Sequence, residues 1–201
     1  MLCQLIPGIR RREARRCESC QPCWPSPAAL ESSDTGTSGW QVLSRVSGVV
    51  TSDALRQWRF FSGLDDGDLQ ALADIAYEST FEDGDTIFQE GSPATTMYLL
   101  RQGWVDINVR SGGQGEQSEL VTMVTRGDVF GWSALVEPHV YTASAGCATP
   151  VSVLAFPADK VLALIRNDAG LCYAIMNRIC QVLASRLRAT RQQLVSLYVV
   201  H

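Results

Sequence analysis

Residues 84–91 read GDTIFQEG, and this stretch opens the part of the sequence that decides the fold. It is followed by MYLL at residues 97–100, GWV at residues 103–105 and GDVFG at residues 127–131. Short apolar segments that begin or end at a glycine are typical of strands joined by tight turns. The series therefore predicts an antiparallel sandwich or roll.

A β-hairpin is expected inside this region. Residues 105–109 alternate apolar and polar side chains, and the glycine-rich segment 112–115 returns the chain into residues 120–124. An alternating segment that a glycine-rich turn returns into a second apolar segment indicates two paired strands. Residues 151–156 form the last apolar strand, so the β-roll is expected to cover about residues 80–157.

Helical patterns flank the roll. Ser52 or Asp53 is the expected N-cap of a short helix, and a second helix is expected to begin near Asp65 or Asp66. After Pro157 the apolar spacing becomes helical over about residues 158–199. The predicted fold class is mainly β with flanking helices: an antiparallel, jelly-roll-like β-roll (a double-stranded β-helix) with N-terminal helices and a long C-terminal helix.

The last helix, about residues 168–199, is roughly 45 Å long at 1.5 Å per residue. An approximate apolar seam follows it, formed by Met176, Ile179, Leu183, Leu187, Thr190, Leu194 and Leu197. One interpretation is a homodimer along this seam, and the other is packing back onto the chain's own roll. Both can hold for different halves of the helix. The arginines at 178, 186, 188 and 191 are interpreted as a solvated face.

Residues 1–50 differ in composition from the rest, so the domain is expected to cover residues 52–201. They combine clustered arginines, three cysteines, prolines and a Ser/Thr/Gly run, which predicts a disordered tail. Cys17, Cys20 and Cys23 also suggest an iron–sulfur or zinc site. Their compressed spacing and the absence of a nearby histidine favour an incidental cluster, and no metal is predicted.

Charge and hydropathy limit the functional classes. The net charge of −4 argues against broad electrostatic attachment to nucleic acid. No stretch reaches the ~18 apolar residues of a membrane helix, and no signal peptide is evident. Three of the seven cysteines, Cys147, Cys172 and Cys180, lie in apolar periodic segments, where a free thiol behaves as a small hydrophobe. A cytoplasmic location is expected.

In order and spacing, these motifs and the flanking helices resemble the cyclic nucleotide-binding domain family over about 145 residues. The resemblance implies that the segment after Phe130 is a phosphate-binding cassette, a short helix whose backbone N–H groups face the cyclic phosphate. The implied cassette and its neighbours give the candidate ligand-binding residues: Gly131, Trp132, Ser133, Ala134, Leu135, Tyr141 and Thr142.

Two positions depart from the family pattern. Trp132 stands where nucleotide-binding members usually carry a glutamate for the ribose, and Tyr141 stands where they usually carry an arginine for the phosphate. Charge-assisted hydrogen bonds contribute roughly 1.5–3 kcal/mol each, so losing both weakens binding by about two to four decades. Three outcomes stay open: weak cyclic nucleotide binding, another small anionic or aromatic ligand held by Trp132, Tyr141, Thr142 and Ser144, or no ligand.

Other classes fit the sequence less well. Transcriptional regulators of the Crp/Fnr type carry a helix-turn-helix after the long helix, whereas this sequence ends at His201, so direct DNA binding is not expected. A cupin enzyme needs clustered histidines, and the chain has two. The predicted function is a non-catalytic small-molecule sensing module that signals through its C-terminal helix. The alternatives are a ligand-free dimerisation or scaffold module that docks on a protein partner and, third, a Crp/Fnr-type transcriptional regulator.

Overall fold

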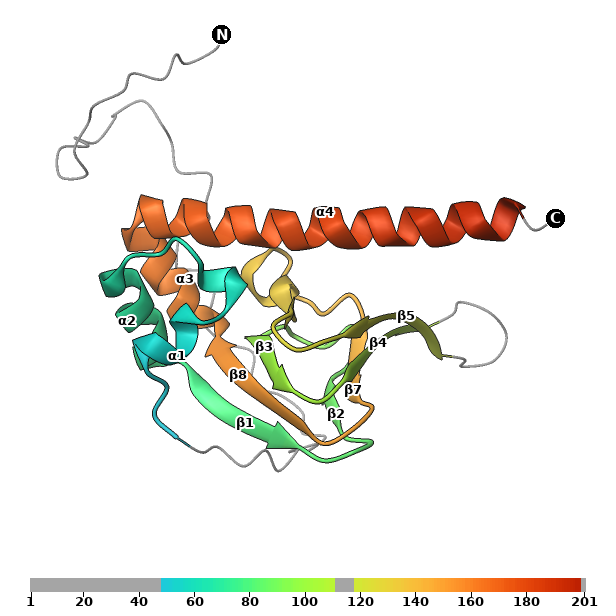
Figure 1. Cartoon of the computed structure of the whole chain (residues 1–201), viewed down its shortest axis with the longest axis horizontal. Helices are drawn as coiled ribbons and strands as arrows, with labels where there is room; N and C mark the ends of the chain where they lie inside the picture. The colour runs from blue at the N-terminus through green and yellow to red at the C-terminus, as the bar shows by residue number, and fades with distance from the viewer. Residues whose placement is uncertain (1–47, 111–117, 200–201) are drawn as a thin grey trace, which may run out of the picture. The chain divides into compact units, whose positions relative to one another are not determined.

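The computed structural model describes residues 48–110 and 118–199, in which eight strands form two antiparallel sheets flanked by helices (Figure 1). The predicted fold class is confirmed. The strands are β1 Tyr77–Phe81, β2 Thr86–Phe88, β3 Thr96–Gln102, β4 Val105–Arg110, β5 Ser118–Val124, β6 Val129–Phe130, β7 Ser144–Cys147 and β8 Val151–Pro157. The helices are α1 Ser52–Arg56, η2 Arg59–Phe61, α2 Asp66–Ile75, η3 Trp132–Leu135, α3 Ala158–Asn167 and α4 Ala169–Val199.

One sheet has the strand order β1-β8-β3-β6, and the other has the order β2-β7-β4-β5. The predicted hairpin is confirmed as β4 and β5, which pair from Val105 with Val124 to Arg110 with Ser118. The register shifts opposite Ile107 and Asn108, so that Val121 is an extra residue on β5. The predicted turn at 112–115 lies outside the described residues.

The core has two parts because the first sheet is covered on both faces. Strand β8 shows this best: Val151 and Val153 pack between the two sheets, whereas Leu154 and Phe156 pack with the helices. A strand buried on both faces needs a nearly continuous apolar run, which is what residues 151–156 supply.

The N-terminal helices begin close to the predicted positions. Asp65 caps α2 by accepting a hydrogen bond from the N–H of Asp68, as expected. The cap of α1 was predicted one or two residues too late, because Thr51 and not Ser52 or Asp53 accepts the hydrogen bond from the N–H of Ala54. All three residue types are good caps, so only the extended backbone at Thr51 distinguishes them.

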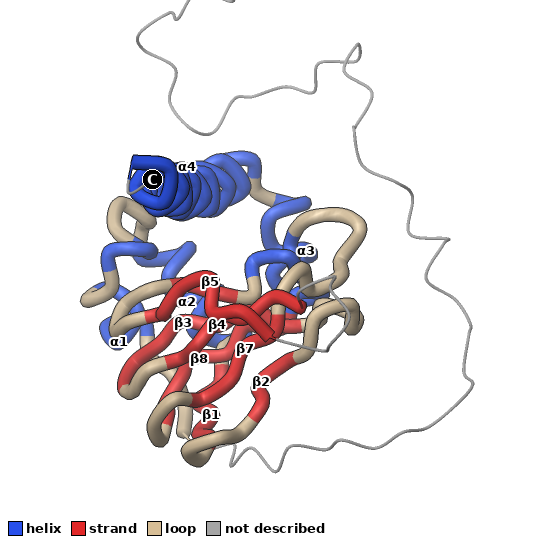
Figure 2. The backbone as a smooth tube through the Cα atoms, turned by 90° about the vertical axis from the view of Figure 1, so that its right-hand side faces the viewer, coloured by secondary structure: helices blue, strands red, loops and turns tan. Residues whose placement is uncertain are grey.

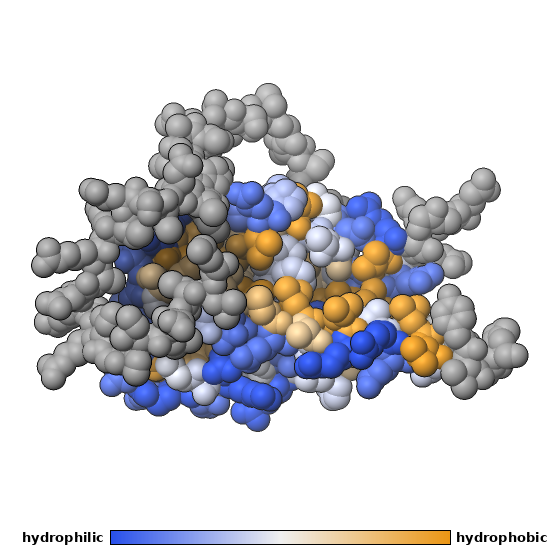
Figure 3. All heavy atoms as spheres, turned by 90° about the horizontal axis from the view of Figure 1, so that it is seen from above, coloured by the Kyte–Doolittle hydropathy of each residue, from blue (hydrophilic) through white to orange (hydrophobic). Residues whose placement is uncertain are grey.

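Helix α4 has two different halves. Its first turns are buried against the core through Leu171, Ile175 and Ile179, so packing onto the chain's own roll is confirmed for this half. Farther along, Leu187 is 71% exposed and Leu194 is 51% exposed. Figure 2 looks along α4 and shows the helix lying above the strands. Figure 3 looks down on it and shows hydrophobic surface along the helix, with hydrophilic residues on both sides.

Candidate functional site

The segment predicted to be the cassette turns sharply between β6 and η3. Gly131 has a φ of 69°, in the left-handed region that disfavours residues with a side chain. A Cβ at this position would lie 3.0 Å from the carbonyl oxygen of Thr96 and 3.3 Å from the ring of Phe88. Both the backbone conformation and the close packing therefore require glycine.

The turn leaves two backbone donors without intrahelical partners. Its first hydrogen bond runs from the N–H of Ala134 to the carbonyl of Gly131, at 3.1 Å. The N–H groups of Trp132 and Ser133 precede this bond, as the first donors of any helix do. The side chains of Ala134 and Leu135 are buried in the core, so these two predicted site residues serve the site through their backbone and position alone.

The side chain of Tyr141 is part of the core, and its hydroxyl is hydrogen-bonded within the protein. Its ring is buried and stacks on Phe88 with the centroids 3.8 Å apart. Its hydroxyl donates to the carbonyl of Thr96 at 2.7 Å and accepts from the N–H of the same residue at 3.2 Å. Burial raises the pKa of this phenol. The expected hydrogen bond from Tyr141 to a ligand therefore competes with two internal ones.

The hydroxyls of Thr142 and Ser144 differ in whether they are free to bind a ligand. The Ser144 hydroxyl oxygen accepts the N–H of Glu90 at 2.9 Å, which ties β7 to the segment that follows β2. Thr142 is exposed and lines the space next to the cassette. The Thr142 hydroxyl therefore stays available to a ligand, whereas the hydroxyl of Ser144 already accepts a hydrogen bond within the protein.

The pocket at the cassette is small. Its volume is about 40 Å³, and it is lined by Gly131, Trp132, Ser133, Tyr141, Thr142, Phe88, Ile107, Phe130, Ala143 and Arg186. Pockets for organic ligands usually measure about 300–1,000 Å³. Five of the seven predicted site residues thus come together, but they and the aromatic rings fill the space that they surround.

Arg186 is the site residue that the sequence analysis missed. It was interpreted as part of a solvated face, but its guanidinium is partly buried and donates from Nη2 to the carbonyl of Val129, at 3.3 Å. Burial lowers the pKa of Arg186, whereas the charge of Asp128 raises it. The sequence does carry one indication that Arg186 is partly buried. It lies seven residues after the buried Ile179, so both residues fall on the same face of α4.

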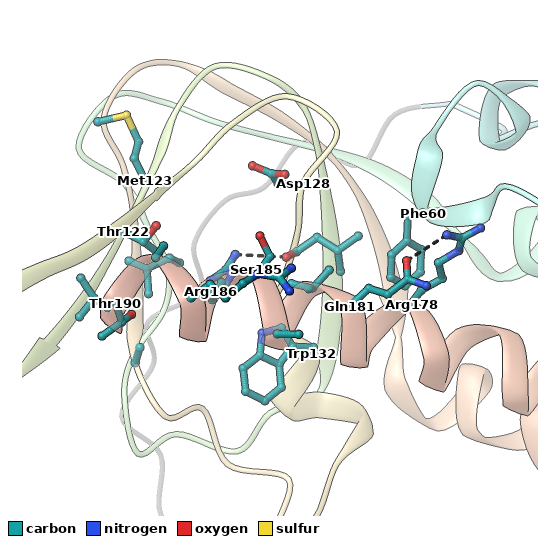
Figure 4. Close-up of a pocket in the computed structure, with 18 of the residues that line it drawn as sticks. Phe60, Thr122, Met123, Asp128, Trp132, Arg178, Gln181, Ser185, Arg186 and Thr190 are labelled. Atoms are coloured by element: carbon teal, nitrogen blue, oxygen red, sulfur yellow. Dashed lines mark hydrogen bonds between the residues drawn. The ribbon is translucent and has the colours of Figure 1, made fainter. Parts of the chain in front are cut away.

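A larger cleft of about 1120 Å³ lies beside the pocket, between α4 and the β4–β5 hairpin. Figure 4 shows Arg178, Gln181, Ser185, Arg186 and Thr190 along the helix that forms one wall. Trp132, Thr142 and Arg186 line both the cleft and the small pocket. The cassette and the helix thus meet at a shared boundary.

Known proteins identify the family. The chain superposes on a solved structure from Geobacter metallireducens, a protein assigned to the cyclic nucleotide-binding proteins, with a TM-score of 0.62. The two sequences are 30% identical, and the match covers 69% of this chain and 98% of the other. This chain belongs to the cyclic nucleotide-binding domain family. The family's sequence profile, "Cyclic nucleotide-binding domain", matches residues 78–168, which include the whole cassette.

Two further members of the family are informative. The CRP-like cAMP-activated global transcriptional regulator of Mycobacterium tuberculosis is 29% identical over 137 residues, which are 68% of this chain and 58% of that protein. The chain thus spans little more than half of that relative. The regulatory subunit of a cAMP-independent protein kinase A from Trypanosoma brucei is 26% identical, with a TM-score of 0.53 over 63% of this chain and 44% of the other.

Two absences concern only the described part of the chain. Within residues 48–110 and 118–199, no three His, Cys, Asp or Glu side chains are grouped as metal ligands would be. Cys17, Cys20 and Cys23 lie outside these residues, so the predicted lack of a metal site stays a prediction. No helix in the same residues combines the length and the apolar character needed to cross a bilayer.

Proposed function

We propose that this cyclic nucleotide-binding domain is a regulatory, non-catalytic module that binds a small molecule between its cassette and α4 and signals through that helix. The observation that carries the proposal is the shared lining of the small pocket. Cassette residues form one side of it, and Arg186 of α4 contributes to the other. A molecule at the cassette therefore cannot avoid contact with the helix.

The small size of the pocket supports a coupling between ligand binding and movement of the residues that line it. A space of about 40 Å³ holds roughly one water molecule, so a ligand enters only when Trp132 or Arg186 moves. A ligand whose entry moves Arg186 binds one position of α4 better than the other, and this difference in affinity is what a population shift needs.

The departures at Trp132 and Tyr141 favour a ligand other than an ordinary cyclic nucleotide. Neither side chain offers the carboxylate or the guanidinium that the family pattern places there. The Trypanosoma brucei protein, described as cAMP-independent, supports the same conclusion, since it is a regulatory relative on this fold. We infer the same kind of role here, in the cytoplasm, with a homodimer or a protein partner and without direct contact to DNA.

A ligand-free scaffold is the second candidate. The exposed apolar residues Leu187, Leu194 and Val195 on the second half of α4 favour it, because a partner helix would bury them. This function needs no pocket ligand, so ligand binding separates the two candidates.

The test is thermal unfolding of the full chain with millimolar cyclic AMP, cyclic GMP and a panel of small metabolites, followed by hydrogen exchange on α4. A ligand at 100 times its dissociation constant adds about 2.7 kcal/mol of stability. The sensor proposal expects a raised midpoint together with changed exchange in the turns around Arg186. If no compound in the panel changes the unfolding midpoint or the hydrogen exchange of α4, the ligand-free scaffold is favoured.

A further inference from the structure

The second sheet, β2-β7-β4-β5, buries one of its faces, and among the described residues no helix packs on the other. Its Val105, Ile107 and Cys147 belong to the core cluster between the two sheets. The core cluster that contains the helices includes no buried residue of these four strands. Side chains alternate along a strand, so those between the inward-facing residues point away from the core. We call this side of the sheet its outer face.

Asp106 of β4 lies on the outer face, because it stands between the inward-facing Val105 and Ile107. It pairs with Met123 of β5 on one side and with Gly146 of β7 on the other. One of its carboxylate oxygens, Oδ1, is buried and has no hydrogen-bond partner within the described part of the chain. A buried polar atom without a partner costs free energy, so a donor supplied by another molecule is favoured at this position.

The arginines of the roll have partners other than Asp106. Residues 77–157 contain ten acidic side chains and three basic ones, Arg101, Arg110 and Arg126. Arg101 and Arg110 form ion pairs with glutamates, and Arg126 lies over the ring of Trp58, 5.4 Å from its centroid. No ion pair within residues 48–110 and 118–199 involves Asp106. The outer face therefore presents a carboxylate on an acidic roll whose own cations are engaged elsewhere.

Trp104 stands beside Asp106 with its backbone fixed. It directly precedes β4, and its side chain is 49% exposed. Its N–H donates to the hydroxyl of Thr149 at 3.0 Å, and its carbonyl accepts the N–H of Ala148 at 3.0 Å. Side chains two residues apart in an extended segment share a face and are about 6.8 Å apart at 3.4 Å per residue. The indole is thus close enough to contact a cation that binds Asp106.

The two residues paired with Asp106 leave room for a long side chain. Gly146 has none of its own, and a Cβ built there would meet its nearest neighbour only at 4.0 Å. Met123 is 44% exposed and lies on the opposite side of β5 from Thr122, which points toward α4 (Figure 4). A flexible thioether suits contact with the methylene groups of a long cationic side chain.

We propose that the outer face of the second sheet, at Trp104, Asp106, Met123 and Gly146, is a docking surface for a protein segment that presents an arginine between apolar residues. The guanidinium pairs with Asp106 and lies against the ring of Trp104, and the apolar neighbours contact Met123. Arginine suits both contacts, since its planar group binds carboxylates through two donors and stacks on aromatic rings. The surface uses neither the cassette nor α4, so it goes beyond the proposed function.

The test compares two peptides that differ in one charge: acetyl-GLRLG-amide, and the same peptide with the uncharged isostere citrulline in place of arginine. Each is titrated into the full chain, and nuclear magnetic resonance follows the backbone amides. The amides of residues 104–108 are expected to shift, and the arginine peptide is expected to bind at least about fivefold more tightly, as an ion pair and a cation–π contact together imply.

Three variants of the full chain identify the contacts. Asp106→Asn is expected to remove the preference for arginine over citrulline. Trp104→Leu keeps an apolar side chain and is expected to weaken binding of the arginine peptide about threefold, through loss of the cation–π contact. The matched control is Asp159→Asn, which neutralises an exposed acid of α3 and leaves both affinities unchanged.

Thermal unfolding distinguishes docking from an internal role of the carboxylate. Since Asp106 has no internal partner among the described residues, Asp106→Asn is expected to unfold at the same temperature as the unchanged chain or higher. A lowered midpoint shows that the carboxylate stabilises the fold and overturns the proposal.

Equal affinities for the two peptides also overturn the proposal, and so does a preference for arginine that survives Asp106→Asn or is lost equally in Asp159→Asn. Shifts confined to residues 82–85 place the cation at the acidic turn after β1 and count against the outer face in the same way. The proposed sensing function is tested with other compounds and read out in α4, so each of the two proposals fails or holds without the other.

Discussion

Replacing Gly131 with alanine tests whether the cassette turn is held by its packing as well as by its backbone conformation. A residue with a side chain loses about 1–2 kcal/mol in the left-handed region. The added Cβ also meets the Thr96 carbonyl oxygen at 3.0 Å and the ring of Tyr98 at 3.2 Å. The Thr96 oxygen is a backbone atom held inside β3, so the strain is not relieved by a rotamer change. Overpacking of this kind adds about 1–3 kcal/mol.

The total expected loss for Gly131→Ala is therefore about 2–5 kcal/mol. Gly84→Ala is the matched control, since Gly84 has a φ of 82° and a Cβ there meets nothing within 4 Å. It is expected to lose about 1–2 kcal/mol, from the backbone alone. Urea unfolding followed by circular dichroism measures both free energies. Losses that agree within about 0.5 kcal/mol would refute the reasoning, because the close contacts would then contribute nothing.

Three further predictions follow from internal contacts. Tyr141→Phe leaves the buried N–H and carbonyl of Thr96 without their partner and is expected to lower the free energy of unfolding by about 1–3 kcal/mol in urea titrations. Burial raises the pKa of Cys147 to about 12, so the folded state favours the neutral thiol. The contribution of this thiol to the free energy of unfolding is therefore level below about pH 9 and falls between about pH 9 and pH 12, and Cys147→Ala is expected to remove that part of the fall in urea titrations. Asp168→Ala removes the carboxylate that accepts the N–H of Leu171 at the start of α4 and is expected to lower the thermal midpoint by a few degrees, for a loss of about 1 kcal/mol.

The fold was predictable because its signals are local. Alternating side chains in residues 105–109 identified β4, and a continuous apolar run identified β8 as a strand. The expected position of the cassette after Phe130 came from the resemblance to the family, whereas the left-handed backbone and the close packing of Gly131 are visible only in the structure. Helix starts were less well determined, because Thr51, Ser52 and Asp53 are consecutive good caps.

The site was harder to predict because its decisive contacts are distant in sequence. The hydroxyl of Tyr141 bonds to Thr96, 45 positions away, so its structural use is not visible from its neighbours. Arg186 contacts Val129 across 57 positions, and a charged residue on a long helix is ordinarily solvated. Sequence reasoning therefore named five of the residues that line the small pocket but not Arg186, which lines it as well.

The unbroken course of α4 has a mechanical consequence. The helix continues for 13 residues beyond Arg186 to Val199, which is about 20 Å at 1.5 Å per residue. If the helix stays straight, a tilt of roughly 10° about Arg186 displaces its far end by about 3–4 Å. The same tilt moves a point one turn (about 5.4 Å) from Arg186 by about 1 Å, so a shift of about 1 Å there corresponds to about 3–4 Å at the far end. For a straight helix, the ratio of the two displacements is the ratio of the two distances from Arg186, so a longer second half gives a larger movement at Val199.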